Sequence, residues 1–275
     1  MSPDNRPIGI FDSGIGGLTI ARSVSQLMPN EQILFFGDTA HLPYGDKSAE
    51  AIKSYVSRIA DFFIENDCKM ILLACNSASA AAYPLLHKLH SNTHPVLNVI
   101  DPNVEYVCKK GHSTIGVIGT KATVSSRTYN RKFATSNPEL KIKSMATPLL
   151  APMIEEGYFN NNISQTIINS YLSNKKLTGI DALVLACTHY PLIKKEIETY
   201  FANQKSKVEI IDSTDVVAAY VKKYIQNKKM SALNGRIPEH QFCVSDFTTS
   251  FQKTTNIFYG EAVKLTHIPI WEMLK

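Results

Sequence analysis

The sequence predicts an α/β protein made of two pseudo-symmetric, doubly wound parallel-sheet domains, with the active site in the cleft between them. Short runs of Leu, Val, Ile and Ala recur along the 275 residues, each with the length and composition of a buried parallel strand. Helical patterns separate these runs, as in a series of β-α units. Polar and reactive residues directly follow several of the runs, at the strand ends where open α/β sheets bind ligands.

The second observation is an internal repeat. The segment PIGIFDS at residues 7–13 aligns with TIGVIGT at residues 114–120 at an offset of 107. Two apolar runs, MILLAC and ALVLAC, end in Cys75 and Cys187, which are 112 residues apart. The third matching pair comprises residues 96–101 and 208–213, in which Asp101 and Asp212 are 111 residues apart. Three strand ends that recur in one order predict two similar structural units.

The repeat also predicts the domain organisation. We expect a first α/β domain of residues 1–99 plus 210–275, and a second of residues 100–209. Packing about a pseudo-twofold axis would place the reactive strand ends of the two domains on opposite walls of one cleft. The tail, a helix near residues 215–228 followed by a strand-and-helix region to Trp271, is expected to return to the first domain.

Local patterns place the remaining elements of the first half. The helix near residues 48–66 is predicted because Ile52, Val56, Ile59 and Phe63 share one face. A loop at 37–45 carries polar groups and an aromatic residue, and it is long enough to fold over a pocket. The other helices expected here end near residue 28 and span about 78–90. The expected strands are residues 7–11, 32–36, 96–100 and the run leading into Cys75.

Composition excludes several classes of protein. Hydrophobic residues make up 44% of the chain and charged residues 19%, values typical of a soluble globular protein. The net charge of +5 is modest and no aromatic residues alternate with the lysine pairs, so we expect no nucleic-acid partner. No run approaches the ~18 to 20 apolar residues of a membrane span, and the N-terminus lacks a signal peptide. The sequence therefore predicts a cytoplasmic protein that does not associate with membranes.

The five cysteines are expected to be reduced thiols, because their number is odd and no secretory signal precedes them. No C-x-x-C spacing occurs, so we expect no metal site. A zinc site formed by Cys75, Cys187 and His189 is the alternative. The cysteines that lack a polar flanking pattern are interpreted as structural, and these are Cys68, Cys108 and Cys243.

A glycine-rich turn, Asp12 to Gly17, follows the first strand and raises the question of a dinucleotide site. The fingerprint of such sites requires glycine at position 19, which is Thr19 here, and Asp12 would place a negative charge beside a pyrophosphate. The turn instead predicts a loop whose glycines let a substrate approach the backbone. Amides at the following helix N-terminus could then bind a carboxylate.

Two thiols on opposite walls of a cleft suit a reaction that needs an acid on one face of a carbon atom and a base on the other. Racemisation next to a carboxylate is such a reaction. A free cysteine has a pKa of about 8.5, so neighbours must help to hold or move the proton. Asp12 and His189 are the nearest candidates, and a helix starting after each cysteine would favour the thiolate. Neutral groups that could hold the substrate are Ser13, Asn76, Ser77 and Thr188.

Each of these residues has a plainer interpretation that the sequence leaves open. A cysteine at a strand end is usually a small core residue. Asp12 could cap the helix that follows it, since Asp is a favoured N-cap. His189 could be a core histidine, and Glu155 and Glu156 could be surface charges. The duplication of the cysteine motif favours catalysis over these alternatives.

Several motifs, in this order along the chain, resemble the glutamate racemases. The match runs from residue 7 to about 213, with a weaker fit at FCVSD near the C-terminus, and it is specific because the motifs occur together. The motifs are Asp12-Ser13-Gly14-Ile15-Gly16-Gly17, Gly37-Asp38-Thr39-Ala40, Pro43-Tyr44-Gly45, Ala74-Cys75-Asn76-Ser77-Ala78, Glu155-Glu156-Gly157 and Ala186-Cys187-Thr188-His189-Tyr190-Pro191.

The resemblance implies interconversion of L- and D-glutamate without a cofactor, supplying D-glutamate for bacterial peptidoglycan, by a protein that forms a homodimer. It implies that Cys75 and Cys187 are the proton donors and acceptors, and that Asp12, Glu155 and His189 assist them. Glu156 is the alternative to Glu155. The substrate contacts that it implies are Asp12, Ser13, Tyr44, Gly45, Asn76, Ser77, Thr188 and His189.

The chain departs from the family at Ser77, where threonine is usual. Serine keeps the hydroxyl but loses a methyl group, so we expect substrate binding with a looser pocket wall. Aspartate racemase is the nearest rival, but that group resembles Cys-Thr-Glu after the second cysteine, whereas this chain has Cys187-Thr188-His189. A one-cysteine decarboxylase or isomerase conflicts with the thiol pair. An amino-acid-binding module is a non-enzymatic alternative, but the thiol pair argues against it because such a module does not need one.

Overall fold

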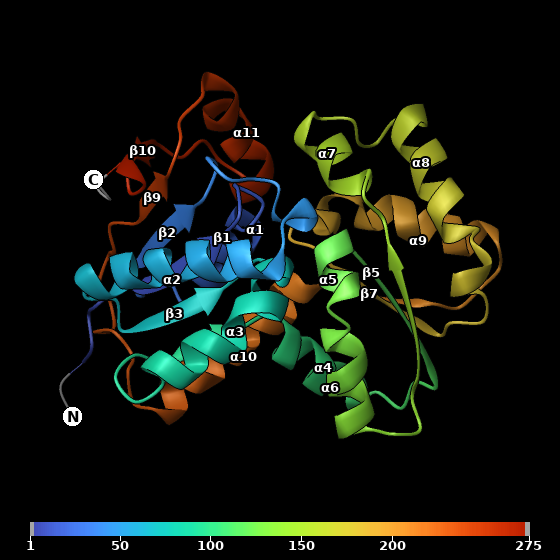
Figure 1. Ribbon diagram of the computed structural model, residues 1–275, viewed down its shortest axis with the longest axis horizontal. Coiled ribbons are helices and arrows are strands. Elements are labelled where there is room, and N and C mark those ends of the chain that lie inside the picture. Colours follow the sequence, from blue (N-terminus) through green and yellow to red (C-terminus); the bar gives the residue numbers. More distant parts are fainter. Residues whose placement is uncertain (1–2, 273–275) are drawn as a thin grey trace.

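The computed structural model describes residues 3–272 and contains two parallel sheets that lie side by side (Figure 1). The first sheet has the strand order β10-β9-β2-β1-β3-β4, and every neighbouring pair in it is parallel. Of the C-terminal strands, β9 pairs with β2 and β10 pairs with β9, so both belong to the first sheet. The strands are β1 (Ile8–Asp12), β2 (Ile33–Gly37), β3 (Met70–Leu73), β4 (Val96–Asn98), β9 (Gln241–Val244) and β10 (Leu265–His267).

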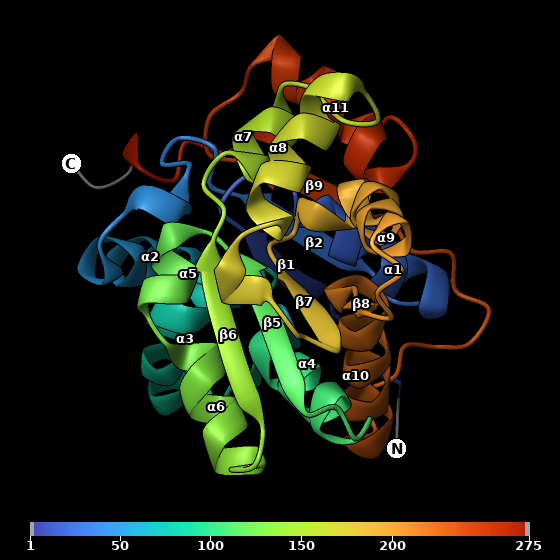
Figure 2. The same ribbon diagram turned by 90° about the vertical axis from the view of Figure 1, so that its right-hand side faces the viewer.

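The second sheet has the order β6-β5-β7-β8, again parallel throughout (Figure 2). This order matches β2-β1-β3-β4 in the first sheet, so the repeat inferred from the sequence is a repeat of topology. The predicted α/β class with two related parallel sheets is confirmed. The exact domain boundaries at residues 99 and 210 stay a prediction. The strands are β5 (Thr114–Gly119), β6 (Lys141–Ala146), β7 (Ala182–Ala186) and β8 (Glu209–Ile211).

Helices connect the strands and cover the sheets. The predicted amphipathic helix is α2, which starts after Ser48, whose side chain accepts a hydrogen bond from the Ala51 amide. It buries Ile52, Val56 and Phe63 and packs against α3, while α1 packs against α10 and α11 (Figure 1). The first set of helices is α1 (Leu18–Leu27), α2 (Ala49–Glu65), α3 (Asn76–His90), α10 (Ser213–Asn227) and α11 (Thr249–Tyr259).

The other helices surround the second sheet, and α4 leads into it. They are α4 (Ile100–Cys108), α5 (Lys121–Ser125), α6 (Thr128–Ser136), α7 (Leu150–Glu155), α8 (Asn162–Leu172) and α9 (Lys194–Asn203). Between residues 3 and 272, no helix has both the length and the apolar character needed to cross a membrane.

Two local expectations are wrong. The strand predicted to extend to residue 100 ends at Asn98, because its side-chain oxygen accepts hydrogen bonds from the amides of Ile100 and Asp101 and starts α4. Asp101 therefore lies in the first turn of a helix. After Cys187 the chain forms a short 3₁₀ turn, η3 (Tyr190–Ile193), and α9 begins only after it. Pro191 has no N–H to donate and restricts the residue before it, which delays the helix.

Candidate active site

A cavity of about 240 Å³ lies between the two sheets, at the carboxyl ends of their central strands. A larger surface hollow of about 560 Å³ lies between α4 and α6, away from both cysteine loops. Of the predicted site residues only Asp12 is missing from the smaller cavity's lining, and it lies fully buried behind it. The predicted residues that line the cavity are Ser13, Tyr44, Gly45, Cys75, Asn76, Ser77, Glu155, Cys187, Thr188 and His189.

Cys75 comes from the first sheet, at the N-cap of α3. Its thiol donates a hydrogen bond to Ser13 Oγ at 3.4 Å and accepts one from the Ala78 amide at 3.5 Å. The Ala78 amide and, with its proton turned to the sulfur, the Ser13 hydroxyl favour the thiolate, but burial and the nearby Asp12 carboxyl outweigh them and raise the pKa of Cys75 to about 12. The start of α3 thus favours the Cys75 thiolate, as expected, but its effect is smaller than that of burial.

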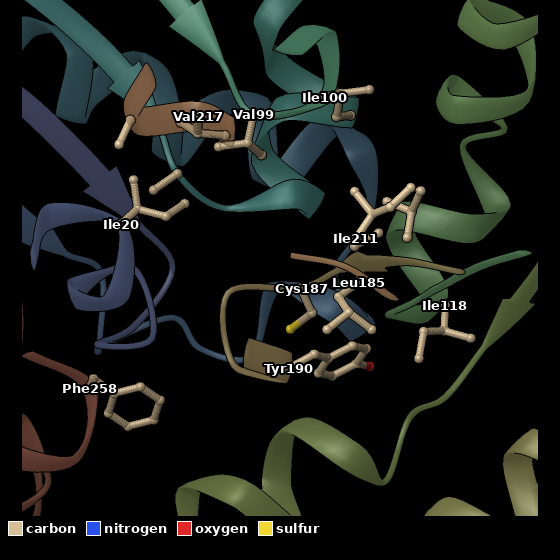
Figure 3. Close-up of a cluster of buried hydrophobic side chains, with 14 of the residues drawn as sticks. Ile20, Val99, Ile100, Ile118, Leu185, Cys187, Tyr190, Ile211, Val217 and Phe258 are labelled. Carbon is tan, nitrogen blue, oxygen red and sulfur yellow. The ribbon is translucent and has the colours of Figure 1, made fainter. Parts of the chain in front are cut away.

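Cys187 comes from the second sheet, directly after β7, and lies beside Leu185 and Tyr190 in a buried cluster (Figure 3). Tyr190 is anchored below it by a 2.7 Å hydrogen bond between its hydroxyl and Thr147 Oγ1. The Cys187 sulfur lies 3.7 Å from His189 Nδ1. The imidazole can therefore exchange a proton with this thiol directly.

The other side of the imidazole faces Glu155. His189 Nε2 lies 2.9 Å from Glu155 Oε1, at an angle outside hydrogen-bond geometry, so the contact is an ion pair. Burial opposes the imidazolium, but the contacts with Cys187 and Glu155 outweigh it and raise the pKa of His189 well above its ordinary value. Glu155 lines the cavity, whereas Glu156 is exposed and does not, so the geometry favours Glu155.

Asp12 ends β1 and points into the glycine-rich loop. Its Oδ2 accepts hydrogen bonds from the amides of Gly17, at 2.9 Å, and Gly14, at 3.3 Å. Burial raises the pKa of Asp12, and the positive charge of His189 and the two amides offset this only in part. Oδ1 is buried, and no described residue forms a hydrogen bond with it. Asp12 thus orders the loop, but it is not the N-cap of α1, which is Gly17, and it keeps a free oxygen beside the site.

The loop that carries Tyr44 and Gly45 is held from behind by Asp38, which is fully buried. Tyr44 donates to Asp38 Oδ2 at 2.6 Å, and Ser245 and Trp271 donate to Oδ1 at 2.6 and 2.9 Å. The C-terminal segment thereby fixes the loop that forms one wall of the cavity. This role of Asp38 was not predicted from the sequence.

The loops of the two sheets approach each other closely at two glycines. A Cβ added at Gly16 would lie 2.6 Å from His189 Nδ1, and one added at Gly45 would lie 2.8 Å from Thr120 Cβ. Both distances are too short for a side chain, so glycine is required at each position. The first sheet's loops therefore contact the Cys187 loop and β5 directly.

Thr120 is a lining residue that the sequence reasoning missed. Its hydroxyl lies 2.8 Å from Ser77 Oγ, and both hydroxyls are hydrogen-bonded to Thr123. Thr120 is the repeat partner of Ser13 in the alignment of residues 7–13 with 114–120, so the repeat contained the signal. The remaining unpredicted lining residues are Gly14, Leu42, Pro43, Ala151, Pro152 and Ala186.

Polar side chains line much of the cavity, but no lysine or arginine is among its lining residues. Anionic groups of a ligand would therefore be held by hydroxyls, amides, the N-terminus of α3 and the His189 imidazolium. Within the part of the chain that the structure describes, no group of three His, Cys, Asp or Glu residues is placed to hold a metal ion. The arrangement suits acid–base chemistry on a small acidic molecule.

The site defines a class: two related parallel sheets that each supply one buried cysteine to a shared cavity. Residues 18–221 match the family model described as Asp/Glu/Hydantoin racemase. A glutamate racemase of Geobacter metallireducens is 36% identical over 93% of each chain. One from Syntrophus aciditrophicus is 36% identical over 95% of this chain and 96% of its own.

Solved structures agree with these matches. The crystal structure of glutamate racemase from Francisella tularensis in complex with D-glutamate has a TM-score of 0.89 and 34% sequence identity, covering 97% of this chain and 98% of that one. The chain belongs to the Asp/Glu/Hydantoin racemase family, and the resemblance stated from its motifs is confirmed.

Proposed function

We propose that this protein interconverts L- and D-glutamate by a two-base mechanism that uses its own side chains and no cofactor. The observation that carries the proposal is that Cys75 and Cys187, one from each sheet, line a single cavity. Family membership and the 34–36% identity with glutamate racemases over nearly the whole chain support glutamate as the substrate.

In the proposed reaction, one cysteine as thiolate removes the α-hydrogen as a proton. The C–H electron pair passes into the α-carboxylate, giving an enolate-like transition state. The other cysteine as thiol then protonates the α-carbon from the opposite face, so the thiol and thiolate exchange places. The reverse reaction uses the same residues in exchanged roles.

The neighbours account for the proton transfers. Without substrate, Cys75 is a thiol at neutral pH because its pKa is about 12, and a substrate ammonium group nearby would favour its ionisation. His189, with Glu155 behind it, exchanges a proton with Cys187, and Asp12 serves the Cys75 side. Ser13, Asn76 and Thr188 supply neutral contacts to the carboxylates.

The proposal extends to the setting of the enzyme. We place it in the cytoplasm, which fits its five free cysteines, and we propose that its D-glutamate enters peptidoglycan synthesis. We also propose that it is a homodimer and that its domains are residues 1–99 plus 210–275 and residues 100–209.

The test is hydrogen exchange in deuterium oxide. Without pyridoxal phosphate, the purified protein is expected to exchange the α-hydrogen of either glutamate enantiomer with solvent and to invert its configuration. Aspartate run in parallel distinguishes the rival racemase activity. A folded protein that binds glutamate but exchanges nothing would be a binding module instead.

Replacing the thiols tests the mechanism. We expect Cys75→Ala and Cys187→Ala each to lower kcat by about 100-fold or more, because each removes an acid–base group. Cys243→Ala, which changes a cysteine outside the cavity, is the matched control and should keep near-normal turnover. Near-normal rates in both active-site variants would refute the two-base assignment.

A further inference from the structure

We propose that Tyr129, held by Asn103, is a positioning residue that turns the amide group of Asn76 so that its NH₂ faces the substrate. Asn76 lines the cavity from α3, whereas Asn103 belongs to α4 and Tyr129 to α6. All three side chains are buried, with at most 3% of their surface exposed. The proposal deepens the proposed function, because it takes a substrate carboxylate as the group that Asn76 binds.

The orientation of the three side chains follows from one backbone carbonyl. Asn103 Nδ2 donates to the carbonyl oxygen of Val99 at 2.9 Å, so that end of the Asn103 amide must be its NH₂. The same Nδ2 lies 3.3 Å from the Tyr129 hydroxyl, which therefore accepts a hydrogen bond from Asn103. The hydroxyl proton of Tyr129 is left to be donated elsewhere.

That proton is donated to Asn76. The Tyr129 hydroxyl lies 2.8 Å from Asn76 Oδ1, so the atom of Asn76 on this side must be the acceptor. If the amide were turned the other way, Tyr129 would face two NH₂ groups and its own proton would have no acceptor. Val99, Asn103 and Tyr129 thus fix Asn76 with its oxygen turned away from the substrate.

The other end of the Asn76 amide is its NH₂ group. Nδ2 is buried and has no hydrogen-bond partner among residues 3–272, which costs free energy unless a ligand accepts from it. Because no lysine or arginine lines the cavity, a fixed neutral donor is valuable for binding a carboxylate. The structure thereby assigns the Asn76 NH₂ to a carboxylate oxygen of the substrate.

The first test removes only the Tyr129 hydroxyl. Tyr129→Phe is expected to raise the KM and the Kd for D-glutamate about 5- to 10-fold with little change in kcat, because Asn76 loses its fixed orientation. Tyr259→Phe is the matched control: it removes a buried hydroxyl that contacts Ser25, and it should leave KM unchanged. A change of less than twofold in Tyr129→Phe, or an equal rise in both variants, would overturn the proposal.

A double-mutant cycle separates positioning from general structure. In an Asn76→Ala background, Tyr129→Phe should change KM by less than twofold, because no amide remains to be oriented. In Asn76→Asp, one carboxylate oxygen still accepts from Tyr129, but the other replaces the NH₂ group that faces the substrate. We expect this variant to bind glutamate about 100-fold more weakly. The assigned orientation is contradicted if the effects of Tyr129→Phe and Asn76→Ala on KM simply multiply. It is also contradicted if Asn76→Asp weakens glutamate binding only slightly.

The same cycle without substrate distinguishes this proposal from the proposed function. Denaturant unfolding of the four proteins should show coupling between Asn76 and Tyr129 whether or not glutamate binds. If the wild-type protein neither binds nor racemises glutamate, the proposed function fails, and the unfolding data still decide whether the two side chains interact. Absence of coupling in unfolding refutes the positioning role itself.

Discussion

At the scale of single residues, Asp12 combines a structural and a proposed catalytic role at a cost in stability. Its carboxyl is fully buried, one oxygen has no partner, and burial raises its pKa above the ordinary value of 3.8. The folded state therefore binds the proton more tightly than the unfolded state. The contribution of Asp12 to the free energy of unfolding is fully present below about pH 4. It must decrease as the pH rises through the pKa that Asp12 has in the folded state.

Asp12→Asn tests this prediction. The asparagine oxygen can still accept from the loop amides and carries no charge, so the variant should become increasingly more stable than the wild type as the pH rises above about 4. Denaturant unfolding between pH 4 and 8 measures the difference, and turnover should fall in the same variant. A stability difference that stays constant over this pH range would contradict a raised pKa of Asp12.

Gly16 shows how a residue without a side chain controls the site. Because an added Cβ would lie 2.6 Å from His189 Nδ1, Gly16→Ala must displace the imidazole or the loop. We expect about 100-fold lower kcat, since a shift of about 1 Å in a catalytic group has that effect, and a stability loss of about 1–3 kcal/mol.

Gly14→Ala is the stability control for this substitution, because its nearest neighbour would be Leu42 at 3.6 Å, an ordinary contact. Unfolding experiments should show the loss only in the Gly16 variant. Unchanged turnover in Gly16→Ala would mean that the position of His189 does not matter for catalysis.

The sequence predicted most site residues, because reactive residues followed recognisable strands and occurred twice. It did not predict Thr120, although the repeat aligned it with Ser13. Asp38 and Tyr129 were also missed, since they act through hydrogen bonds between segments far apart in the chain. Contacts of this kind leave no local pattern.

At the scale of elements, the apolar strands were predictable, including β4 and β8 at the sheet edges, but the more polar edge strand β6 was not. The strand β6 was absent from the expected elements because its sequence, KIKSMA, is not a continuous apolar run. It lies at the edge of the second sheet, where most of its residues are only half buried. The helix after Cys187 begins later than the sequence predicts, because the 3₁₀ turn η3 precedes α9.

The loop that carries Tyr44 depends on the buried hydrogen bonds of Asp38. Asp38→Ala leaves the buried donors of Tyr44, Ser245 and Trp271 without an acceptor, and should lower the free energy of unfolding by about 3 kcal/mol and raise KM. Asp38→Asn should be milder, because its oxygen can still accept from Trp271. The fluorescence of Trp271, the single tryptophan, reports unfolding. Equal effects of both variants would argue against the hydrogen bonds as the cause.

At the scale of the whole molecule, the duplicated sheet explains why the site lies where it does. Each repeat alone ends its central strands in polar residues at one edge, and only the pair encloses a cavity. The repeat was visible in the sequence, but the distance between the two cysteine loops depends on side-chain packing across the cavity. Gly16 against His189 and Gly45 against Thr120 set that distance.

A buried positive charge connects three segments at the amino ends of the first sheet's strands, on the side opposite the cavity. Lys69, fully buried before β3, donates to Glu31 at 2.5 Å and to the carbonyl oxygens of Asp4 and Met230 at 2.9 and 2.8 Å. Its ammonium group thus connects the N-terminal segment, the start of β2 and the segment that follows α10. Glu31 is satisfied further by the Ala232 amide at 2.9 Å.

Lys69→Met should lower the free energy of unfolding by about 3–5 kcal/mol, because it leaves the buried Glu31 carboxylate without its counter-charge. Adding Glu31→Gln removes that charge while keeping an oxygen for Ala232, so the double variant should recover part of the loss. KM and kcat of the folded proteins should stay unchanged, since the cluster lies at the edge of the sheet opposite the cavity. Denaturant unfolding and racemase assays of the three proteins check both statements. A double variant no more stable than Lys69→Met would show that the lost contacts to the carbonyl oxygens, and not the unpaired charge, dominate the cost.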